Sequence, residues 1–283
     1  MDFLDLDLNK TADEPVGFHR ARWRAGLWLV IAALIAGAAA AVYVKYGRAL
    51  KNAPAAETRQ AEAKPKPAPQ PLGGQAAPID VPPLDQTDQI VRELVKQVTS
   101  NPRIAAWLAT DGLIRNFTVG VANVAEGTTP AGKFGVLRPR SAFETTGSAG
   151  SLRVAPRSYE RYNDLAAAMA SIDPAGAARL YATLKPRIEE AYRDLGYQEA
   201  SFDRALEKAI VSLLQVPATD AASRVEPRSV GLGYAYADPA LEGLSAAQKQ
   251  LLRTGPDNVR TIQSSLRQIA LALGIPAERL PGE

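Results

Sequence analysis

The sequence predicts a mainly α protein in which one transmembrane helix and a proline- and alanine-rich tether precede a helical globular domain with a small β element. Three observations carry this prediction: an uncharged apolar run, a proline-rich segment without aromatic residues, and apolar stripes with helical spacing. The chain therefore divides into a short tail (1–24), a transmembrane helix (25–44), a disordered linker (45–83) and a globular domain (84–283).

The overall composition excludes several functional classes. The 283 residues are 46% hydrophobic and 22% charged, which is sufficient for a packed core. Thirty-three basic and 30 acidic residues give a net charge of +3, without the basic excess of a nucleic-acid-binding protein. There is no cysteine and only one histidine, His19, so disulfides, thiolate zinc sites and Ser-His or multi-histidine chemistry lack their parts. We expect no metal, no cofactor and no nucleic-acid partner.

The apolar run A-G-L-W-L-V-I-A-A-L-I-A-G-A-A-A-A-V-Y-V occupies residues 25–44. At 1.5 Å per residue it covers about 30 Å, the hydrocarbon thickness of a bilayer. Aromatic residues lie near both expected interfaces, as in membrane proteins generally: Trp23, Trp28, Tyr43 and Tyr46. The alternative is a signal peptide cleaved near Ala38–Ala41. The run is longer than a typical signal core and follows a long acidic tail, which favours an uncleaved anchor in the lipid bilayer.

The charges that flank the run do not decide its orientation. Three basic residues stand on each side: Arg20, Arg22 and Arg24 before it, and Lys45, Arg48 and Lys51 after it. The positive-inside rule therefore gives a tie. The crowding of the three arginines and the shortness of the tail favour a cytoplasmic N-terminus, with the C-terminal domain on the opposite side.

The predicted linker is rich in proline. Eight prolines occur between residues 52 and 83, including K-P-K-P-A-P-Q-P at 64–71, and no aromatic residue lies between Tyr46 and Trp107. Such a segment cannot bury enough surface to fold, and its prolines favour an extended polyproline conformation. At about 3.1 Å per residue it reaches on the order of 100 Å. A ligand for an SH3-like domain is an alternative to a semi-rigid spacer.

The domain contains repeated helical stripes. Apolar side chains recur at helical spacing in residues 90–98, 113–124, 180–195, 202–214 and 259–273, and a capping box, Ser245 to Gln248, begins a further helix. Asp173 and Pro174 provide an N-cap and a first-turn proline for the third stripe. Pro186 lies inside that stripe, and we expect it to break or kink the helix.

Two stretches depart from helical spacing. Residues 128–156 are rich in Gly, Pro, Ser and Thr, with short apolar pieces at 134–137 and 152–155, and the sequence leaves their fold open. Residues 230–237 read V-G-L-G-Y-A-Y-A, in which large and small side chains alternate. This period of two predicts a short strand or extended arm, one face of which is bare enough for close approach.

Five motifs follow one another through the domain: Leu113–Phe117, Pro156–Tyr162, Ala191–Tyr197, Tyr236–Glu242 and Gln248–Asn258. In this order they resemble a bacterial family known as domain of unknown function 3014, and the resemblance covers most of residues 80–273. Its members look like single-pass membrane-anchored proteins with an alanine- and proline-rich tether. The resemblance implies a bacterial envelope protein. Together with the orientation favoured above, it predicts an anchor in the inner membrane and a periplasmic C-terminal domain. It implies no activity and no catalytic residues.

Glu242 and Asp238 are the candidate catalytic residues. A glutamate can act as a general acid on a glycan if burial raises its pKa, and glycoside hydrolysis usually needs a second carboxylate. The alternative is structural. Asp238 then begins a turn before Pro239, and Glu242 pairs with a basic residue such as Lys249 or Arg253.

A basic stretch is the candidate for anion binding. Its basic residues between positions 128 and 161 are Lys133, Arg138, Arg140, Arg153, Arg157 and Arg161. Only Glu144 and Glu160 oppose them, and Tyr159 and Tyr162 lie alongside. Arginine forks in this setting can bind a carboxylate, a phosphate or an anionic polymer. A solvated charged face is the alternative.

Two functional classes remain. The first is a tethered binding or scaffold module, with an envelope protein or a cell-wall polymer as its partner. The second is an envelope glycan hydrolase or lyase that uses Glu242. A concave pocket around a desolvated Glu242 would favour the enzyme, whereas a Glu242 bound to a basic residue would favour the binding module. Because the structural interpretation of Glu242 and Asp238 is favoured over the catalytic one, we favour the binding module over an enzyme.

Overall fold

The computed structural model describes residues 71–130, 134–135, 138–139, 141–219, 223–228 and 233–282. The chain divides into two units, and all described residues belong to the second unit, Pro69–Glu283. The predicted membrane anchor, residues 25–44, lies outside the described residues. Within the described parts of 71–282, no helix is both long enough and apolar enough to cross a bilayer.

The larger hydrophobic core lies between long helices that the apolar stripes predict. These helices are α2 (Asp88–Lys96), α4 (Leu113–Ala125), α7 (Pro174–Asp194), α8 (Phe202–Leu214) and α11 (Pro256–Ala272), with the short α3 (Pro102–Leu108) and the 3-10 turn η1 (Leu84–Gln86) beside them. α4 and α11 each pack on both α7 and α8. Phe202 is fully buried, with its ring 5.4 Å from that of Tyr192 and 5.9 Å from that of Phe117. The mainly α fold is therefore confirmed.

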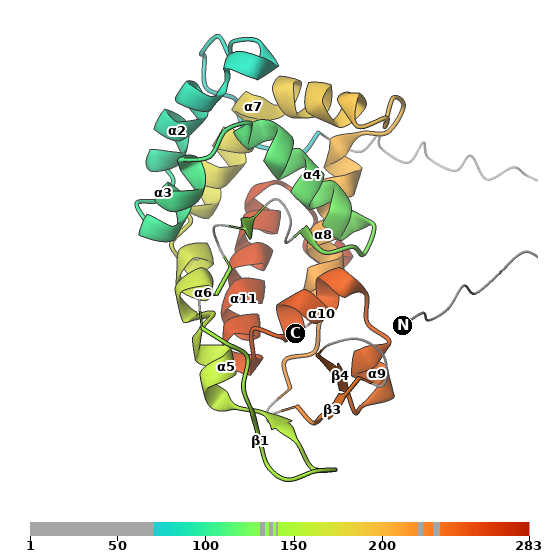
Figure 1. Cartoon of the computed structure of the whole chain (residues 1–283). Helices are drawn as coiled ribbons and strands as arrows, with labels where there is room; N and C mark the ends of the chain where they lie inside the picture. Colours follow the sequence, from blue (N-terminus) through green and yellow to red (C-terminus); the bar gives the residue numbers. More distant parts are fainter. Residues whose placement is uncertain are drawn as a thin grey trace, which may run out of the picture. The chain divides into compact units, whose positions relative to one another are not determined.

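The domain has a second, smaller cluster of buried apolar side chains. α6 (Asn163–Ala170), α10 (Ala246–Leu252) and the first half of α11 contribute its buried side chains, among them the fully buried Val259. The short helices α5 (Pro156–Glu160) and α9 (Pro239–Glu242) belong to the same part of the domain (Figure 1). The predicted capping box is present, because the Ser245 hydroxyl accepts from the Gln248 amide while the Gln248 side chain accepts from the Ser245 amide.

Two small antiparallel hairpins complete this end of the domain. β1 (Thr145–Thr146) pairs with β2 (Arg153–Val154), and β3 (Val225–Pro227) pairs with β4 (Tyr234–Tyr236). These are two separate two-stranded sheets, and a bridge between Arg153 and Arg224 places the two hairpins side by side. The strand predicted over 230–237 is present as β4, while residues 230–232 lie outside the described residues.

Pro186 does not break the helix in which it lies. α7 is one helix of 21 residues, from Pro174 to Asp194, so of the expected break or kink the break is wrong. Pro186 is exposed, so its ring lies on the outer face of the helix. Burial of the apolar side chains on both sides of Pro186 favours one continuous helix.

The last residues of the predicted linker, 71–83, lie against the helices; we call this segment the strap. Leu72 is buried, with 8% of its surface exposed, and its amide donates to Asp203 Oδ2 at 3.1 Å. The Gly73 amide donates to the Leu273 carbonyl at 2.9 Å, close to the C-terminal end of α11. The strap therefore joins the domain where α8 begins and α11 ends.

Asp203 is the centre of a polar cluster that receives the strap. Its Oδ1 accepts from the Tyr181 hydroxyl at 2.6 Å, and its Oδ2 accepts from Lys185 Nζ at 2.5 Å as well as from the Leu72 amide. Burial and the hydrogen bond to this carboxylate raise the pKa of Tyr181, which keeps its hydroxyl a donor. Each polar group of this partly buried cluster thus has a partner.

We predict that the strap contributes to the stability of the domain. In a fragment of residues 69–283, Leu72→Ala should lower the free energy of unfolding by about 2 kcal/mol, because a buried leucine is truncated. The measurement is urea denaturation followed by circular dichroism. The control is Leu271→Ala, a change at a leucine that is 48% exposed, which should stay within about 0.5 kcal/mol. Equal effects of the two substitutions would contradict a docked strap.

Candidate anion-binding pocket

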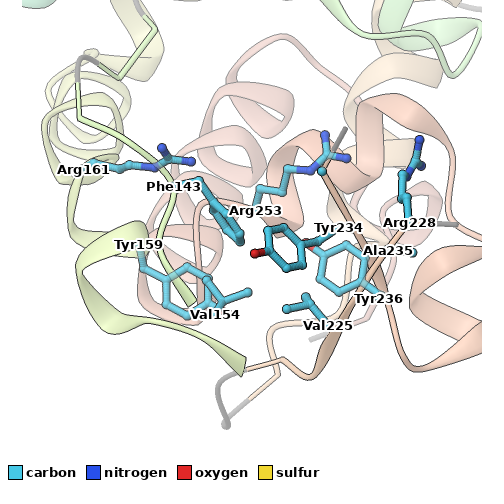
Figure 2. A pocket seen from close by; sticks show the side chains of 11 residues that line it. Phe143, Val154, Tyr159, Arg161, Val225, Arg228, Tyr234, Ala235, Tyr236 and Arg253 are labelled. Atoms are coloured by element: carbon cyan, nitrogen blue, oxygen red, sulfur yellow. The ribbon is translucent and has the colours of Figure 1, made fainter. Parts of the chain in front are cut away.

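A hollow of about 350 Å³ lies between the segment that precedes α5 and the two hairpins (Figure 2). We call it the arginine–aromatic pocket. Its lining residues are Phe143, Val154, Tyr159, Arg161, Val225, Arg228, Gly233, Tyr234, Ala235, Tyr236 and Arg253. Figure 2 shows the three guanidinium groups along one side and the tyrosine rings on the other. The volume is within the range of small-ligand sites.

A buried serine holds one wall of the pocket in place. Ser158, on α5, is 1% exposed. Its hydroxyl donates to the Glu144 carbonyl at 2.8 Å and accepts from the Glu144 amide at 2.7 Å. This reciprocal pair attaches the segment around Phe143 and β1 to α5. Pro156 at the first position of the helix fixes where α5 begins.

Arg161 is oriented by backbone carbonyls and aromatic rings. Its Nε donates to the Ser158 carbonyl at 2.9 Å, and its Nη1 donates to the Ser141 carbonyl at 3.0 Å. The guanidinium carbon lies 5.6 Å from the Phe143 ring centre and 5.1 Å from that of Tyr162. These hydrogen bonds use Nε and Nη1, and the Nη2 donors of Arg161 have no hydrogen-bond partner among the described residues.

Tyr159 connects α5 with the turn between α10 and α11. Its ring lies on Gly255, where a Cβ atom would be 2.5 Å from the ring, and Gly255 has a φ of +90°. The Tyr159 hydroxyl accepts from the Ser223 amide at 3.3 Å, and its carbonyl accepts from Asn258 Nδ2 at 3.1 Å. Glycine is therefore needed at 255 both for its backbone conformation and for the close approach of the ring.

The other two arginines come from distant parts of the chain. Arg253 follows α10, is exposed, and has one long contact, 3.4 Å from its Nη1 to Gln250 Oε1. Arg228 follows β3, with its side chain 47% exposed and its Nη2 3.5 Å from Glu242 Oε1. Among the described residues that line the pocket, none is acidic. Burial raises the pKa of Tyr236, so this hydroxyl brings no negative charge at neutral pH.

Glu242 stands beside the pocket and is engaged on both oxygens. Its Oε1 accepts from Lys249 Nζ at 2.9 Å, and its Oε2 accepts from the Tyr236 amide at 3.0 Å. The lysine hydrogen bond, followed by the Tyr236 amide, lowers the pKa of Glu242, whereas a general acid needs a raised one. Asp238 Oδ1 accepts from the Ala240 amide at 2.8 Å and caps α9. Both carboxylates thus have the structural contacts that the alternative interpretation expects.

The structure brings together only part of the predicted basic stretch. Arg161 lines the pocket, whereas Arg138, Arg153 and Arg157 are exposed and do not line it. Lys133 and Arg140 lie outside the described residues. Sequence reasoning missed Arg228 and Arg253 as site residues. Arg253 stands inside the motif Gln248–Asn258 and could have been found there, but no signal in the sequence points to Arg228.

A second hollow, between α2 and α3, is a weaker candidate. It is lined by residues of 92–109, including Arg92. Arg92 donates from Nε to the Leu108 carbonyl at 2.7 Å and from Nη2 to the Thr110 carbonyl at 2.9 Å, and its charge is paired with Asp88 and Asp111. In the part of the chain that the structure describes, no group of three acidic or histidine side chains is arranged to hold a metal ion.

Comparison with known proteins gives one match. The family described as "Protein of unknown function (DUF3014)" matches residues 113–270. No curated protein and no solved structure matches the chain. The described lining residues of the arginine–aromatic pocket, 143–253, all lie within the matched region, and the second hollow lies outside it. The matched region therefore contains the complete described pocket.

We predict that Ser158 is a main attachment of the pocket wall. Ser158→Ala should lower the free energy of unfolding by about 2 kcal/mol, because the Glu144 amide and carbonyl lose a shared partner in a buried setting. Denaturant titration measures the effect. Ser148→Ala, at an exposed serine of the β1–β2 connection, serves as the control and should change stability by less than about 0.5 kcal/mol. If Ser158→Ala left the free energy of unfolding unchanged, the hydrogen bonds of Ser158 to Glu144 would not be a main attachment of the pocket wall.

The lowered pKa of Glu242 predicts a pH dependence of stability. A carboxylate with a lowered pKa in the folded state stabilises the fold above its unfolded pKa, and this contribution is lost as the pH falls through the folded pKa. Glu242→Gln should therefore lower the free energy of unfolding by about 1 kcal/mol at neutral pH and much less in strong acid. Denaturation at several pH values tests this. If Glu242→Gln lowered the free energy of unfolding by the same amount at every pH, the ion pair between Glu242 and Lys249 would be contradicted.

Proposed function

The chain belongs to the DUF3014 family, and we propose that it is a membrane-anchored binding protein whose tethered domain binds an anionic group in the arginine–aromatic pocket. In this proposal residues 25–44 span the inner membrane of a bacterial cell, with the N-terminus in the cytoplasm. The linker then carries the domain into the periplasm. The ligand belongs to an envelope protein or a cell-wall polymer.

One observation carries the proposal of anion binding. Arg161, Arg228 and Arg253 come from three separate segments and meet at one hollow, where no described lining residue is acidic. Structural arginines are normally paired with carboxylates. Arg228 is paired with Glu242, whereas Arg161 and Arg253 have no carboxylate partner among the described residues and stand at a pocket with an apolar floor. An anion with an apolar body complements such a surface in both charge and shape.

The sequence supports the proposed location. The twenty uncharged residues 25–44 have the length of a membrane span, and the proline-rich segment that follows has the composition of a spacer. A domain on a long tether is suited to bind a component at some distance from the bilayer. This arrangement fits a binding or scaffold protein.

The geometry of Glu242 favours binding over hydrolysis. Its two oxygens are held by Lys249 and by the Tyr236 amide, and its pKa is lowered. Asp238 is engaged as a helix cap. A glycan hydrolase would need a protonated carboxyl that faces an open site, so the pair lacks the state that the reaction requires.

We predict that anion binding depends on the pocket arginines. The purified full-length chain in detergent is titrated at low and high salt with three probes: an acidic peptide of alternating glutamate and valine, polygalacturonate, and phosphatidylglycerol vesicles. At least one probe should bind, and high salt should weaken it. Arg161→Lys with Arg253→Lys keeps the charge, removes the guanidinium fork and should reduce affinity by about tenfold.

Arg157→Lys is the matched control for this experiment, because Arg157 is exposed on α5 but does not line the pocket. This substitution should leave the affinity unchanged. The proposal fails if none of the three probes binds at low salt, or if Arg157→Lys has as large an effect as the double substitution.

The proposed topology has its own test. A fusion of alkaline phosphatase after residue 283 should be active in a bacterial host, and a fluorescent protein that does not fold after export should be dark at the same position. The full-length chain should stay with membranes after alkaline extraction and should retain an N-terminal tag. If the fluorescent protein is dark when fused to the N-terminus and bright when fused to the C-terminus, the chain has the opposite orientation.

A further inference from the structure

The edge of β4 next to the pocket is only partly occupied. The Arg228 amide donates to the Gly233 carbonyl, and the Ala237 amide donates to the Arg224 carbonyl, each at 3.0 Å. These bonds turn the even-numbered residues of β4 away from β3, because backbone groups alternate along a strand. The amides and carbonyls of Tyr234 and Tyr236 therefore face the outer edge.

Glu242 closes one half of this edge and leaves the other half open. The Tyr236 amide donates to Glu242 Oε2 at 3.0 Å, which blocks that position. The amide and carbonyl of Tyr234 have no hydrogen-bond partner in the described part of the chain. Tyr234 thus offers one backbone donor and one backbone acceptor at the mouth of the pocket.

Two aromatic side chains are exposed at the same place. Phe143 and Tyr234 have 38% and 37% of their surface exposed, and their ring centres lie 5.4 Å apart. Arg161 stands over the Phe143 ring. Large aromatic side chains are rarely left at the surface as a contacting pair beside arginines, and such groups are enriched where proteins bind one another.

Resting on the function proposed above, we infer that the arginine–aromatic pocket binds an extended acidic segment of a partner protein. The segment lies along the open edge of β4, exchanges backbone hydrogen bonds with Tyr234 and places carboxylates on Arg161 and Arg253. Addition of a strand to a sheet edge is a common mode of peptide recognition, in which side-chain pockets supply specificity.

The polar groups of the pocket fit a peptide better than a sugar. Sugar hydroxyls donate as well as accept, and sugar-binding sites commonly use carboxylate or amide side chains as acceptors. None of the described lining residues is Asp, Glu, Asn or Gln, and the Tyr159 hydroxyl already accepts from Ser223. Arginine supplies only donors, which suits carboxylates. The backbone of Tyr234 supplies a donor and an acceptor, which suits a peptide.

The test measures how the alternating glutamate–valine peptide and four comparison probes bind to the full-length chain. Two of these probes are altered peptides: one has lysine in place of glutamate, and the other is methylated on alternate backbone nitrogens. The other two probes are polygalacturonate and phosphatidylglycerol vesicles. The acidic peptide should bind, the lysine peptide should not, and backbone methylation should reduce affinity by about tenfold because edge hydrogen bonds are lost.

The protein variants separate charge from folding. Arg253→Gln should weaken binding of the peptide by about tenfold, and Arg161→Gln with Arg253→Gln should weaken it further. Arg204→Gln removes an exposed charge near the start of α8 and should leave the affinity unchanged. Because Arg161 also holds the Ser141 carbonyl, thermal unfolding of each variant is recorded, and the conclusion rests on Arg253→Gln, whose side chain is exposed.

The outcomes distinguish this inference from the proposed function. Equal binding of the methylated peptide, or equal binding to Arg253→Gln and Arg204→Gln, overturns edge pairing on β4. Arginine-dependent binding of polygalacturonate or vesicles without binding of the peptide also overturns the peptide inference, and it leaves anion binding in place. Failure of every anionic probe overturns both.

Discussion

The contact between the Tyr159 ring and Gly255 holds the pocket end of the domain together. No other residue type fits at 255, because a Cβ atom would be 2.5 Å from the ring and the backbone has a φ of +90°. The contact fixes α5 against the turn that leads into α11. Once α5 is fixed, Ser158 positions the segment around Phe143, and Arg161 reaches the hollow. The pocket is therefore a consequence of close packing between segments almost a hundred residues apart in sequence.

The sequence predicts the helices well because each has a local signal. The stripes over 113–124, 202–214 and 259–273 correspond to α4, α8 and α11, and the capping box at Ser245 starts α10. The first hairpin is harder to predict, because β1 and β2 have only two residues each, and β2 also bridges to the distant Arg224. Strands of this length have no period that a sequence pattern can display.

The site is only partly visible in the sequence for a similar reason. Arg161 belongs to a local excess of basic residues, whereas Arg228 and Arg253 join it only through the fold. The strap was assigned to the linker because it contains prolines and no aromatic residue. Its order depends on Leu72 and on the Asp203 cluster, which are contacts with helices more than a hundred residues away.

Glu242 illustrates how one residue type supports two interpretations until its partners are known. Its ion pair with Lys249 and its bond to the Tyr236 amide close half of the β4 edge, which limits the part of this edge open to other chains. The same carboxylate holds Arg228 at 3.5 Å beside the pocket. Glu242 therefore positions Arg228 and part of β4 beside the pocket, and it does not face the pocket as a general acid.

The most direct measurement of the central claim is nuclear magnetic resonance of the arginine side chains during titration with the acidic peptide. The Nε–H signals of Arg161, Arg228 and Arg253 report on the pocket, and those of Arg157 and Arg204 report on exposed positions elsewhere. The account predicts saturable shifts of the first three signals at one common affinity, with the other two unchanged. Uniform small shifts of all five signals, or shifts confined to Arg157 and Arg204, would contradict it.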